Sequence, residues 1–232
     1  MESGLLFGAI KLEIKQYTWD KIDSNSWLIL ENKHGLLIDA VENEELYKAI
    51  KPLESLTIIL THCHFDHIIG LNQIRRIKPE TEVIATKLCS EYIGNKFRNM
   101  SASATAFMCF YKGEKKNNGP ITPFICGSAE MTFENEMIIR WQRHNIKLTA
   151  VHGHSQDSLV LQFDEDILFT GDTLLRNTTV TRLPGGNTRR FWEEDIPLLR
   201  AMKAQKVYPG HGTSGKLSKM LEKTGKETYM IT

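Results

Sequence analysis

Six of the eight histidines in this chain lie in short segments that are rich in metal-binding residue types. The densest segment is Thr61-His62-Cys63-His64-Phe65-Asp66-His67, the second is Val151-His152-Gly153-His154, and His211 lies in a third. Imidazoles and carboxylates are ligands that Zn²⁺ accepts at about 2.0–2.2 Å, and a set without thiolates is compatible with an open coordination position. These residue types therefore point to a catalytic metal site.

The spacing within the first segment can serve two adjacent ions. Residues two apart at the end of a strand point to the same side, so His62 and His64 can present their imidazoles to one metal. The turn that follows would bring Asp66 and His67 toward a neighbouring point. Cys63 lies between the two histidines and should point away from them, which predicts a buried thiol rather than a reactive thiol near the metals.

Hydrophobic periodicity predicts an alternation of strands and helices around these segments. The first half is expected to contain strands at 10–14, 26–30 and 35–39, a helix at 42–50, a strand at 56–60, a helix at 68–77 and a strand at 82–85. The second half is expected to contain strands at 131–133, 137–141, 146–151, 158–163 and 167–170, a helix at 191–203, a strand at 206–208 and a helix at 216–224. This order suggests two similar layers.

Length and composition predict one globular domain over residues 1–232, because 41% of the residues are hydrophobic, 25% are charged and no linker is evident. The segment at about 90–125 has an erratic period and contains the clearest loop, at 112–123. We expect this segment to be a variable insertion above the site.

Charge and cysteine content narrow the classes of partner. A formal net charge of +1 lacks the basic excess of a nucleic-acid-binding protein. No apolar run approaches the roughly 20 residues needed to cross a bilayer, and residues 5–10 are too short for a signal sequence. The four cysteines form no Cys-x-x-Cys pair and are expected to be reduced. We therefore expect a cytoplasmic protein that binds neither nucleic acid nor membrane, with its oligomeric state left open.

The first segment resembles the His-x-His-x-Asp-His signature of the metallo-β-lactamase-fold hydrolases. Three further segments match that family's motifs in its order: Gly153-His154-Ser155, Phe169-Thr170-Gly171-Asp172-Thr173 and Tyr208-Pro209-Gly210-His211-Gly212. The resemblance covers roughly residues 15 to 213. It implies an α/β fold, a four-layer αβ/βα sandwich of the metallo-β-lactamase type, with metals at one edge of the two sheets.

The same resemblance implies the ligands and the cofactors. Carried over position by position, it implies one metal held by His62, His64 and His154, a second held by Asp66, His67 and His211, and a bridge between them by Asp172. The implied cofactors are two Zn²⁺ ions, with Fe or Mn as alternatives. His152 stays open as a ligand, a substrate contact or a satisfied polar residue, whereas His34 and His144 are expected outside the site.

The resemblance further implies a metal-dependent hydrolase that uses a metal-bridging hydroxide. Asp66 would act as the catalytic residue by orienting the nucleophile. Four residues near the ligands are candidates to fix the imidazole tautomers: Thr61, Ser155, Asp157 and Thr173. The alternatives are an iron-dependent persulfide dioxygenase, a lactonase, β-lactamase or phosphodiesterase, a tRNA-processing nuclease and a non-catalytic binding protein on the same scaffold.

The glyoxalase II branch is the most similar subgroup, on the stretch Thr181-Arg182-Leu183-Pro184-Gly185-Gly186-Asn187 and on the last motif. That branch has a Cys-Gly-Arg segment after its Gly-Asp-Thr, and this chain has none. The expected partner is a small-molecule acyl substrate, and a thioester is the first expectation among acyl compounds. Four aromatic residues of the expected insertion hint at an apolar acyl group: Phe107, Phe110, Tyr111 and Phe124. Three arginines near Asp172 could instead hold an anionic group: Arg182, Arg189 and Arg190.

Overall fold

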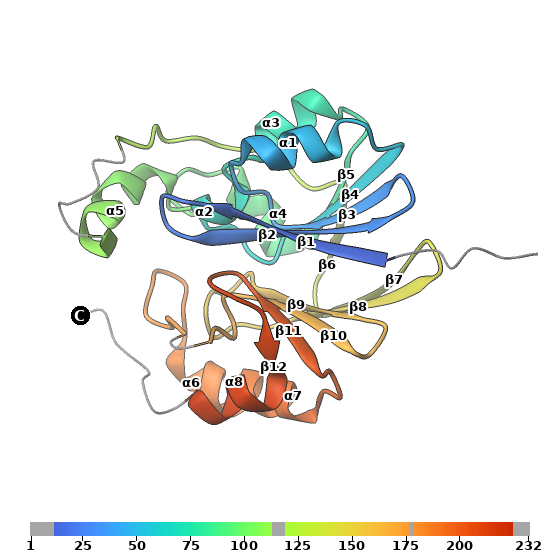
Figure 1. The fold of residues 1–232 in the computed structure, drawn as a ribbon. Helices are drawn as coiled ribbons and strands as arrows, with labels where there is room; N and C mark the ends of the chain where they lie inside the picture. The colour runs from blue at the N-terminus through green and yellow to red at the C-terminus, as the bar shows by residue number, and fades with distance from the viewer. Residues whose placement is uncertain (1–11, 113–118, 177–178, 225–232) are drawn as a thin grey trace, which may run out of the picture.

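The computed structural model describes residues 12–112, 119–176 and 179–224 and places them in two six-stranded sheets that pack face to face. Helices cover the outer face of each sheet, so the layers run helix, sheet, sheet, helix (Figure 1). The predicted α/β four-layer sandwich is confirmed.

The first sheet has the strand order β1-β2-β3-β4-β5-β6. Its strands are β1 (Leu12–Trp19), β2 (Ser24–Glu31), β3 (His34–Ile38), β4 (Ser55–Ile59), β5 (Glu82–Thr86) and β6 (Met131–Phe133). The strands β3 to β6 run parallel to one another. Their carboxyl ends therefore meet at one edge of the sheet, which is where α/β folds gather functional side chains.

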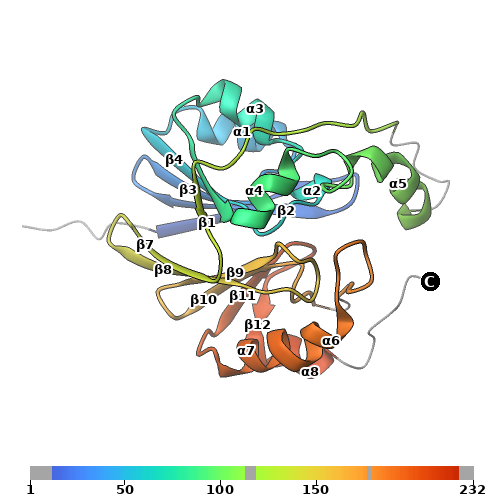
Figure 2. The same ribbon diagram turned by 180° about the vertical axis from the view of Figure 1, so that it is seen from behind.

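The second sheet has the order β12-β11-β10-β9-β8-β7. Its strands are β7 (Glu136–Trp141), β8 (His144–Ala150), β9 (Leu159–Phe163), β10 (Ile167–Gly171), β11 (Lys206–Pro209) and β12 (Gly215–Lys216). The chain passes from one sheet to the other between β6 and β7, and Figure 2 shows this crossing from behind. An isolated bridge between Ser24 and His211 joins the two sheets at the opposite edge.

The helices separate into two groups by the sheet that they accompany in the chain. With the first sheet come α1 (Glu44–Ile50), α2 (Phe65–Ile68), α3 (Leu71–Ile77), α4 (Lys87–Ile93), the 3₁₀ turn η1 (Ser101–Ser103) and α5 (Ala104–Lys112). With the second come α6 (Thr188–Arg190), the π-helical turn η2 (Phe191–Asp195), α7 (Ile196–Ala201) and α8 (Leu217–Lys223). No helix within the described residues is long and apolar enough to span a membrane.

Three clusters of buried apolar side chains hold these layers together. The central cluster lies between the sheets and contains Ile29, Ile59 and Phe169, all fully buried. The outer clusters pack the helices onto their sheets, through residues such as Ile74 in the first half and Leu199 in the second. Burial of this kind stabilises a fold by about 1.5–3 kcal/mol for each large apolar side chain. The layers therefore form a stable base for the loops at the sheet edge.

The expected strands and helices agree with the structure in type and order, apart from local differences. The expected helix at 191–203 consists of the π-helical turn η2 and the helix α7, which ends at Ala201, and the short helix α6 before it was not expected. β1 continues to Trp19 because it pairs along its whole length with β2. The expected helix at 68–77 is two helices, α2 and α3, separated by Gly70, where a Cβ atom would come within 2.3 Å of the Val41 carbonyl oxygen. β12 was not expected, since two residues carry no periodicity.

The expected insertion at 90–125 is anchored in the core at both ends. Ile93 and Cys126 are buried, and the Cys126 amide donates to the Ile93 carbonyl over 2.9 Å. Part of the expected loop at 112–123 lies outside the described residues, as do residues 5–10 and the beginning of the expected strand at 10–14.

Candidate metal centre

The first histidine segment begins immediately after β4, and its residues leave the strand in an extended turn before α2 begins at Phe65. His62 and His64 are buried, and their ring centroids lie 4.5 Å apart. Asp66 and His67 follow on the first turn of α2. One short stretch of chain therefore delivers two side chains to each of two neighbouring groups, as its spacing predicted.

The first group consists of His62, His64 and His154, with one ligand-type atom of each residue within 4.8 Å of the others. His154 comes from the loop between β8 and β9. Its Nε2 lies 3.1 Å from His64 Nδ1. The Nε2 of His62 is buried without any hydrogen-bond partner. A buried nitrogen of this kind costs free energy unless something binds it.

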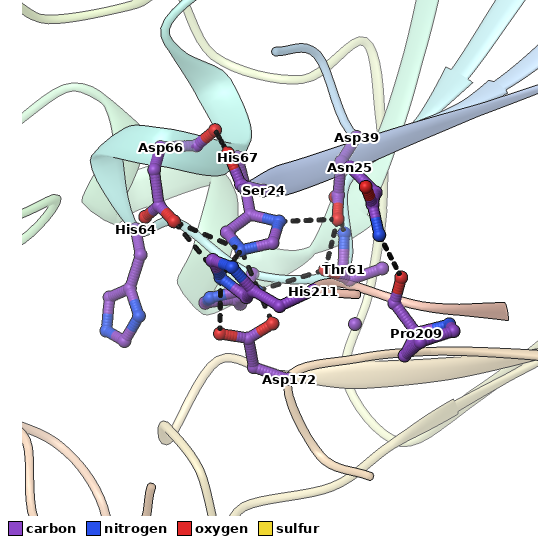
Figure 3. Close-up of polar contacts among 12 residues, drawn as sticks. Ser24, Asn25, Asp39, Thr61, His64, Asp66, His67, Asp172, Pro209 and His211 are labelled. Atoms are coloured by element: carbon purple, nitrogen blue, oxygen red, sulfur yellow. Dashed lines mark hydrogen bonds and ion pairs between the residues drawn. The ribbon is translucent and has the colours of Figure 1, made fainter. Parts of the chain in front are cut away.

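The second group consists of Asp66, His67 and His211. His211 follows β11, and its Nε2 lies 3.3 Å from Asp66 Oδ2 and 3.4 Å from His67 Nε2 (Figure 3). The ring nitrogens of two histidines and a carboxylate oxygen therefore converge on one point. His211 is placed there because the Gly210 amide donates to the Gly171 carbonyl, which ties the end of β11 to the end of β10.

Asp172 lies between the two groups at the end of β10. Its Oδ1 is 3.4 Å from His67 Nε2, and its Oδ2 is 3.3 Å from His211 Nε2 and 3.7 Å from His154 Nε2. Gly171 precedes it with φ of 48°, and a Cβ atom there would come within 2.4 Å of Thr61 Oγ1. Only glycine fits this close left-handed turn, and the turn directs Asp172 toward both groups.

These distances fit a pair of metal ions. Ligands about 2.0–2.1 Å from a tetrahedral ion lie roughly 3.3–3.4 Å from one another. The separations of 3.1 Å between His64 and His154, and of 3.3–3.4 Å within the second group, match that spacing. The partnerless buried atoms His62 Nε2 and Asp172 Oδ1 also need a binding partner. The seven residues therefore form a His/Asp group that is able to bind a dinuclear metal site.

A buried carboxylate outside the seven residues fixes part of this arrangement. Asp39 Oδ2 lies 2.9 Å from His67 Nδ1, and both side chains are buried. Asp39 also accepts hydrogen bonds from the amide and the hydroxyl of Thr61, at 2.7 and 2.8 Å. The Thr61 hydroxyl lies 3.0 Å from His62 Nδ1. Asp39 thus orients one imidazole directly and a second through Thr61, as outer partners of metal-binding histidines commonly do.

Backbone carbonyls orient two further imidazoles. His154 Nδ1 lies 2.7 Å from the Val180 carbonyl oxygen, and His211 Nδ1 lies 3.2 Å from that of Ile22. These contacts place the N–H at Nδ1 and leave Nε2 of both rings free to bind a metal.

The four residues expected to fix tautomers have different roles. Thr61 contacts His62, as expected. Asp157 instead accepts the amide hydrogen of Cys63, and the Ser155 hydroxyl pairs with that of Ser158. The Thr173 hydroxyl is buried and has no hydrogen-bond partner. Asp39 was not among the four candidates, yet it contacts His67 directly and His62 through Thr61. The only signal for Asp39 in the sequence is that it directly follows a strand of apolar residues.

The two groups differ in electrostatics. Burial, with smaller contributions from the neighbouring rings, lowers the pKa of His62 well below its ordinary value and the pKa of His64 to about 4. These imidazoles are therefore neutral at pH 7, the form that binds metal. In the second group, burial lowers the pKa of His211, but Asp172 and Asp66 outweigh burial and raise the pKa to about 10. In the second group, the negative charges of Asp66 and Asp172 thus offset the positive charge of a protonated His211.

The family model of the metallo-beta-lactamase superfamily matches residues 19–211. The chain belongs to this superfamily. Among curated proteins it is 26% identical over 201 residues to a "probable metallo-hydrolase" of Streptococcus pyogenes, covering 82% of this chain and 79% of that protein. It is 24% identical to a hydroxyacylglutathione hydrolase of Prochlorococcus marinus, covering 82% of this chain and 64% of the relative.

Solved structures of this superfamily share the fold. The BLEG-1 B3 metallo-beta-lactamase superposes with a TM-score of 0.73 at 23% identity, over 92% of this chain and 100% of the other. ETHE1 from Myxococcus xanthus gives 0.63 at 20% identity, over 89% and 80%. TTHA1623, solved in a di-iron-bound form, gives 0.68 at 20% identity, over 92% and 100%. These likenesses show the fold.

Several residues that the sequence offered as possible ligands, substrate contacts or neighbours of the site lie outside the candidate metal centre. His152 is half-buried, and its Nδ1 lies 2.7 Å from the Gln156 carbonyl, so the structure places it with a backbone partner and not in either ligand group. Arg189 and Arg190 form ion pairs with Glu193 and Glu194 on the same helical segment. Cys63 is buried, as its alternate position predicted. His34 and His144 also lie outside both groups.

A cavity of about 240 Å³ opens over the candidate metal centre. Five residues of the two ligand groups and their bridge line it: His64, Asp66, His154, Asp172 and His211. The candidate centre is therefore accessible to a small molecule through this cavity.

Proposed function

We propose that the protein is a dinuclear zinc hydrolase that acts on a small-molecule thioester or a similar acyl substrate. The observation that carries the proposal is the convergence of two ligand groups, with Asp172 facing both, at the base of one cavity. A single-ion site would use one group and leave the other as a cluster of buried polar atoms. A pair of ions accounts for all seven side chains.

In this proposal His62, His64 and His154 would hold the first ion, Asp66, His67 and His211 would hold the second, and Asp172, which faces both groups, would be available to both ions. When bound, a metal pair lowers the pKa of a water molecule toward 7 and polarises a carbonyl oxygen. The chain supplies fixed positions, because the Nδ1 atoms of His67, His154 and His211 are engaged by Asp39, Val180 and Ile22.

Asp66 is the proposed catalytic residue. Burial raises the pKa of its carboxyl, but His67 and His211 outweigh burial and hold the pKa below its ordinary value, so the group is charged at pH 7. Asp66 lines the cavity. It is therefore placed to accept a hydrogen bond from the attacking water and to direct the water's lone pair at an acyl carbon in the cavity.

Thioesters are placed first because a thiolate is a better leaving group than an alkoxide or an amine. The likeness to a hydroxyacylglutathione hydrolase also supports an acyl thioester. Zinc is placed first because imidazoles and carboxylates suit it, although the same ligands also accept Fe and Mn. Metal content is therefore the first measurement.

The test combines metal analysis with a substrate panel. Protein purified under native conditions would be analysed for metals, reconstituted with zinc and assayed on acyl thioesters of coenzyme A, glutathione and carrier-protein mimics by release of the free thiol. We expect two zinc ions per chain and turnover of at least one thioester. Esters, lactones, β-lactams and phosphodiesters complete the panel, and an Asp172→Ala protein serves as the inactive comparison.

Two results would overturn the proposal. Iron in the native protein, with oxygen uptake on glutathione persulfide, would identify a persulfide dioxygenase. Zinc-loaded protein that hydrolyses no member of the panel would favour a non-catalytic binding protein on the same scaffold.

A further inference from the structure

The walls of the cavity above the ligand groups are apolar. Beyond the five residues of the candidate centre, its described lining consists of Ile22, Phe65, Met100, Phe107, Leu175, Val180 and Leu183. These residues come from the β1–β2 turn, α2, the η1–α5 segment and the two stretches that flank residues 177–178. Among the described residues, the lining above the ligand groups therefore presents hydrocarbon to any group that enters the cavity.

The apolar wall is built onto the ligands. Val180 lines the cavity, and its carbonyl oxygen accepts the hydrogen bond from His154 Nδ1. Phe65 directly follows His64 and packs against Phe107 with ring centroids 6.3 Å apart. A substrate that packs against this wall is consequently held at a fixed position relative to the ligand groups.

No lysine or arginine is among the described residues that line this cavity. Arg189 and Arg190 are paired with glutamates, and Arg182 is exposed outside the lining. Arg98 lines a separate cavity that also borders His64. A carboxylate at the far end of the acyl group, against these walls and away from the ligand groups at the base, would lose its hydration without gaining a lysine or arginine partner among the described lining residues, which is strongly unfavourable.

We propose that this cavity selects an uncharged, apolar acyl group, with Phe107 and Leu183 setting its preference. This inference rests on the proposed hydrolase function, because it names the acyl half of the substrate of that same site. The metal ligands form the reactive end of the cavity, and the hydrocarbon walls bind the chain attached to the carbonyl carbon.

The first test varies only the acyl group, using thioesters of N-acetylcysteamine with acetyl, butyryl, pentanoyl and hexanoyl groups. Each methylene that becomes buried should raise kcat/KM by about fourfold until the cavity is full. Succinyl, which is close to pentanoyl in size but carries a carboxylate, should react at least about a hundredfold more slowly. Equal rates along the series, or a preference for succinyl, would overturn the inference.

Variants of Phe107 and Leu183 test whether these two residues determine the acyl-group preference. Phe107→Ala should reduce the gain in kcat/KM from acetyl to hexanoyl. The matched control is Phe97→Ala, because Phe97 is 73% exposed and lines the separate cavity with Arg98. Leu183→Arg would place a cation at the rim and should raise the ratio of succinyl to pentanoyl turnover by at least about tenfold. Acyl preferences that stay unchanged in both wall variants would contradict the assigned walls.

A binding measurement separates this inference from the proposed function. The uncharged ketone 2-octanone would be titrated into metal-free protein and followed by tryptophan fluorescence, since Trp19 packs against Phe65 with ring centroids 6.3 Å apart. We expect saturable binding that Leu183→Arg weakens and Phe97→Ala leaves unchanged. If the ketone binds but no acyl compound is hydrolysed, the hydrolase proposal is contradicted and the apolar site is supported. If acyl compounds are hydrolysed but the ketone does not bind and chain length has no effect, the apolar site is contradicted and the hydrolase proposal is supported.

Discussion

Asp39 and His67 are joined by a hydrogen bond of 2.9 Å between two side chains that are almost wholly buried. The bond connects the end of β3 to α2 and turns the Nε2 atom of His67 toward Asp66, Asp172 and His211. Asp39 has φ of 60° and accepts three hydrogen bonds, so its position is determined by several contacts at once. The second ligand group depends on a residue that does not belong to it.

Asp39→Asn keeps the size of the side chain and tolerates the left-handed backbone, but it removes the charge that orients His67. We expect the protein to fold and to bind its second metal ion about 10–100-fold more weakly. Competition with a chromogenic chelator measures this affinity. Asp166→Asn, in an exposed turn, is the control and should bind both ions normally. Unchanged metal affinity in Asp39→Asn would contradict the role of Asp39 in orienting His67.

Asp66→Asn tests the proposed catalytic residue. The amide cannot serve both as an anionic ligand and as an acceptor for the attacking water, so turnover on any substrate should fall by at least about a hundredfold. Metal content measured on the same sample shows how much of the loss comes from a missing ion. Near-normal kcat would refute the role assigned to Asp66.

Local geometry predicted the pairing within the first ligand segment, whereas His154, Asp172 and His211 were predicted from the resemblance of their motifs to those of the metallo-β-lactamase-fold hydrolases. His62 and His64 follow the apolar run of β4, and Asp172 follows that of β10. Residues two apart at a strand end share a side, so pairing within a segment could be worked out from local geometry. Whether the seven bind metal remains a prediction that the convergence of their atoms supports.

The partners of the ligands could not be predicted in the same way. Asp39 and Thr61 meet because β3 and β4 are parallel neighbours, a relation that neither strand shows by itself. Val180 acts through its carbonyl oxygen, which every residue possesses. Periodicity predicted a helix from residue 191, but it did not show that the first turn, η2, is π-helical, because that turn packs against the loop at Gly153. The partners of the ligands are determined by contacts between segments that are distant in the sequence, which local patterns do not show.

Asp195 holds the loop that carries His154. Its buried carboxylate accepts the amide hydrogens of His152 and Gly153 at 3.2 and 2.7 Å. Asp195→Ala would leave both amides without partners, so we expect a loss of about 1–3 kcal/mol in the free energy of unfolding. Urea unfolding measures this loss, and the metal content of the variant should fall as well. Glu194→Gln is the neighbouring control, because Glu194 pairs with Arg190 at the surface.

The four cysteines should differ sharply in reactivity. Burial raises the pKa of the Cys126 thiol to about 12 and those of Cys63 and Cys89 well above their ordinary value, whereas Cys109 is exposed. At pH 8 a disulfide reagent should therefore label one thiol per chain quickly and four after unfolding. Cys109→Ser should remove the fast phase. Rapid labelling of two or more thiols in that variant would contradict the burial of the other three.

The same shift gives a pH dependence of stability. The folded state retains the Cys126 proton up to about pH 12, whereas the unfolded state loses it near pH 9, so the free energy of unfolding should fall as the pH rises through that window. Unfolding of wild type and of Cys126→Ala at pH 8 and pH 10.5 measures this. The variant should lose less stability between the two pH values, and an equal loss would contradict the assignment.

Gly210 lies where the second ligand group is tightest. A Cβ atom at this position would come within 2.2 Å of Asp172 Oδ1 and 2.8 Å of His67 Cε1, so even alanine must displace a ligand. Gly210→Ala should therefore lose metal, with affinity at least about tenfold lower, because misplaced ligands cannot keep the coordination geometry. Gly94→Ala is the matched control, since a Cβ atom there would meet its nearest atom at 3.5 Å. Calorimetric titration with zinc compares the two, and normal stoichiometry and affinity in Gly210→Ala would show that Asp172 and His67 are not held against this turn.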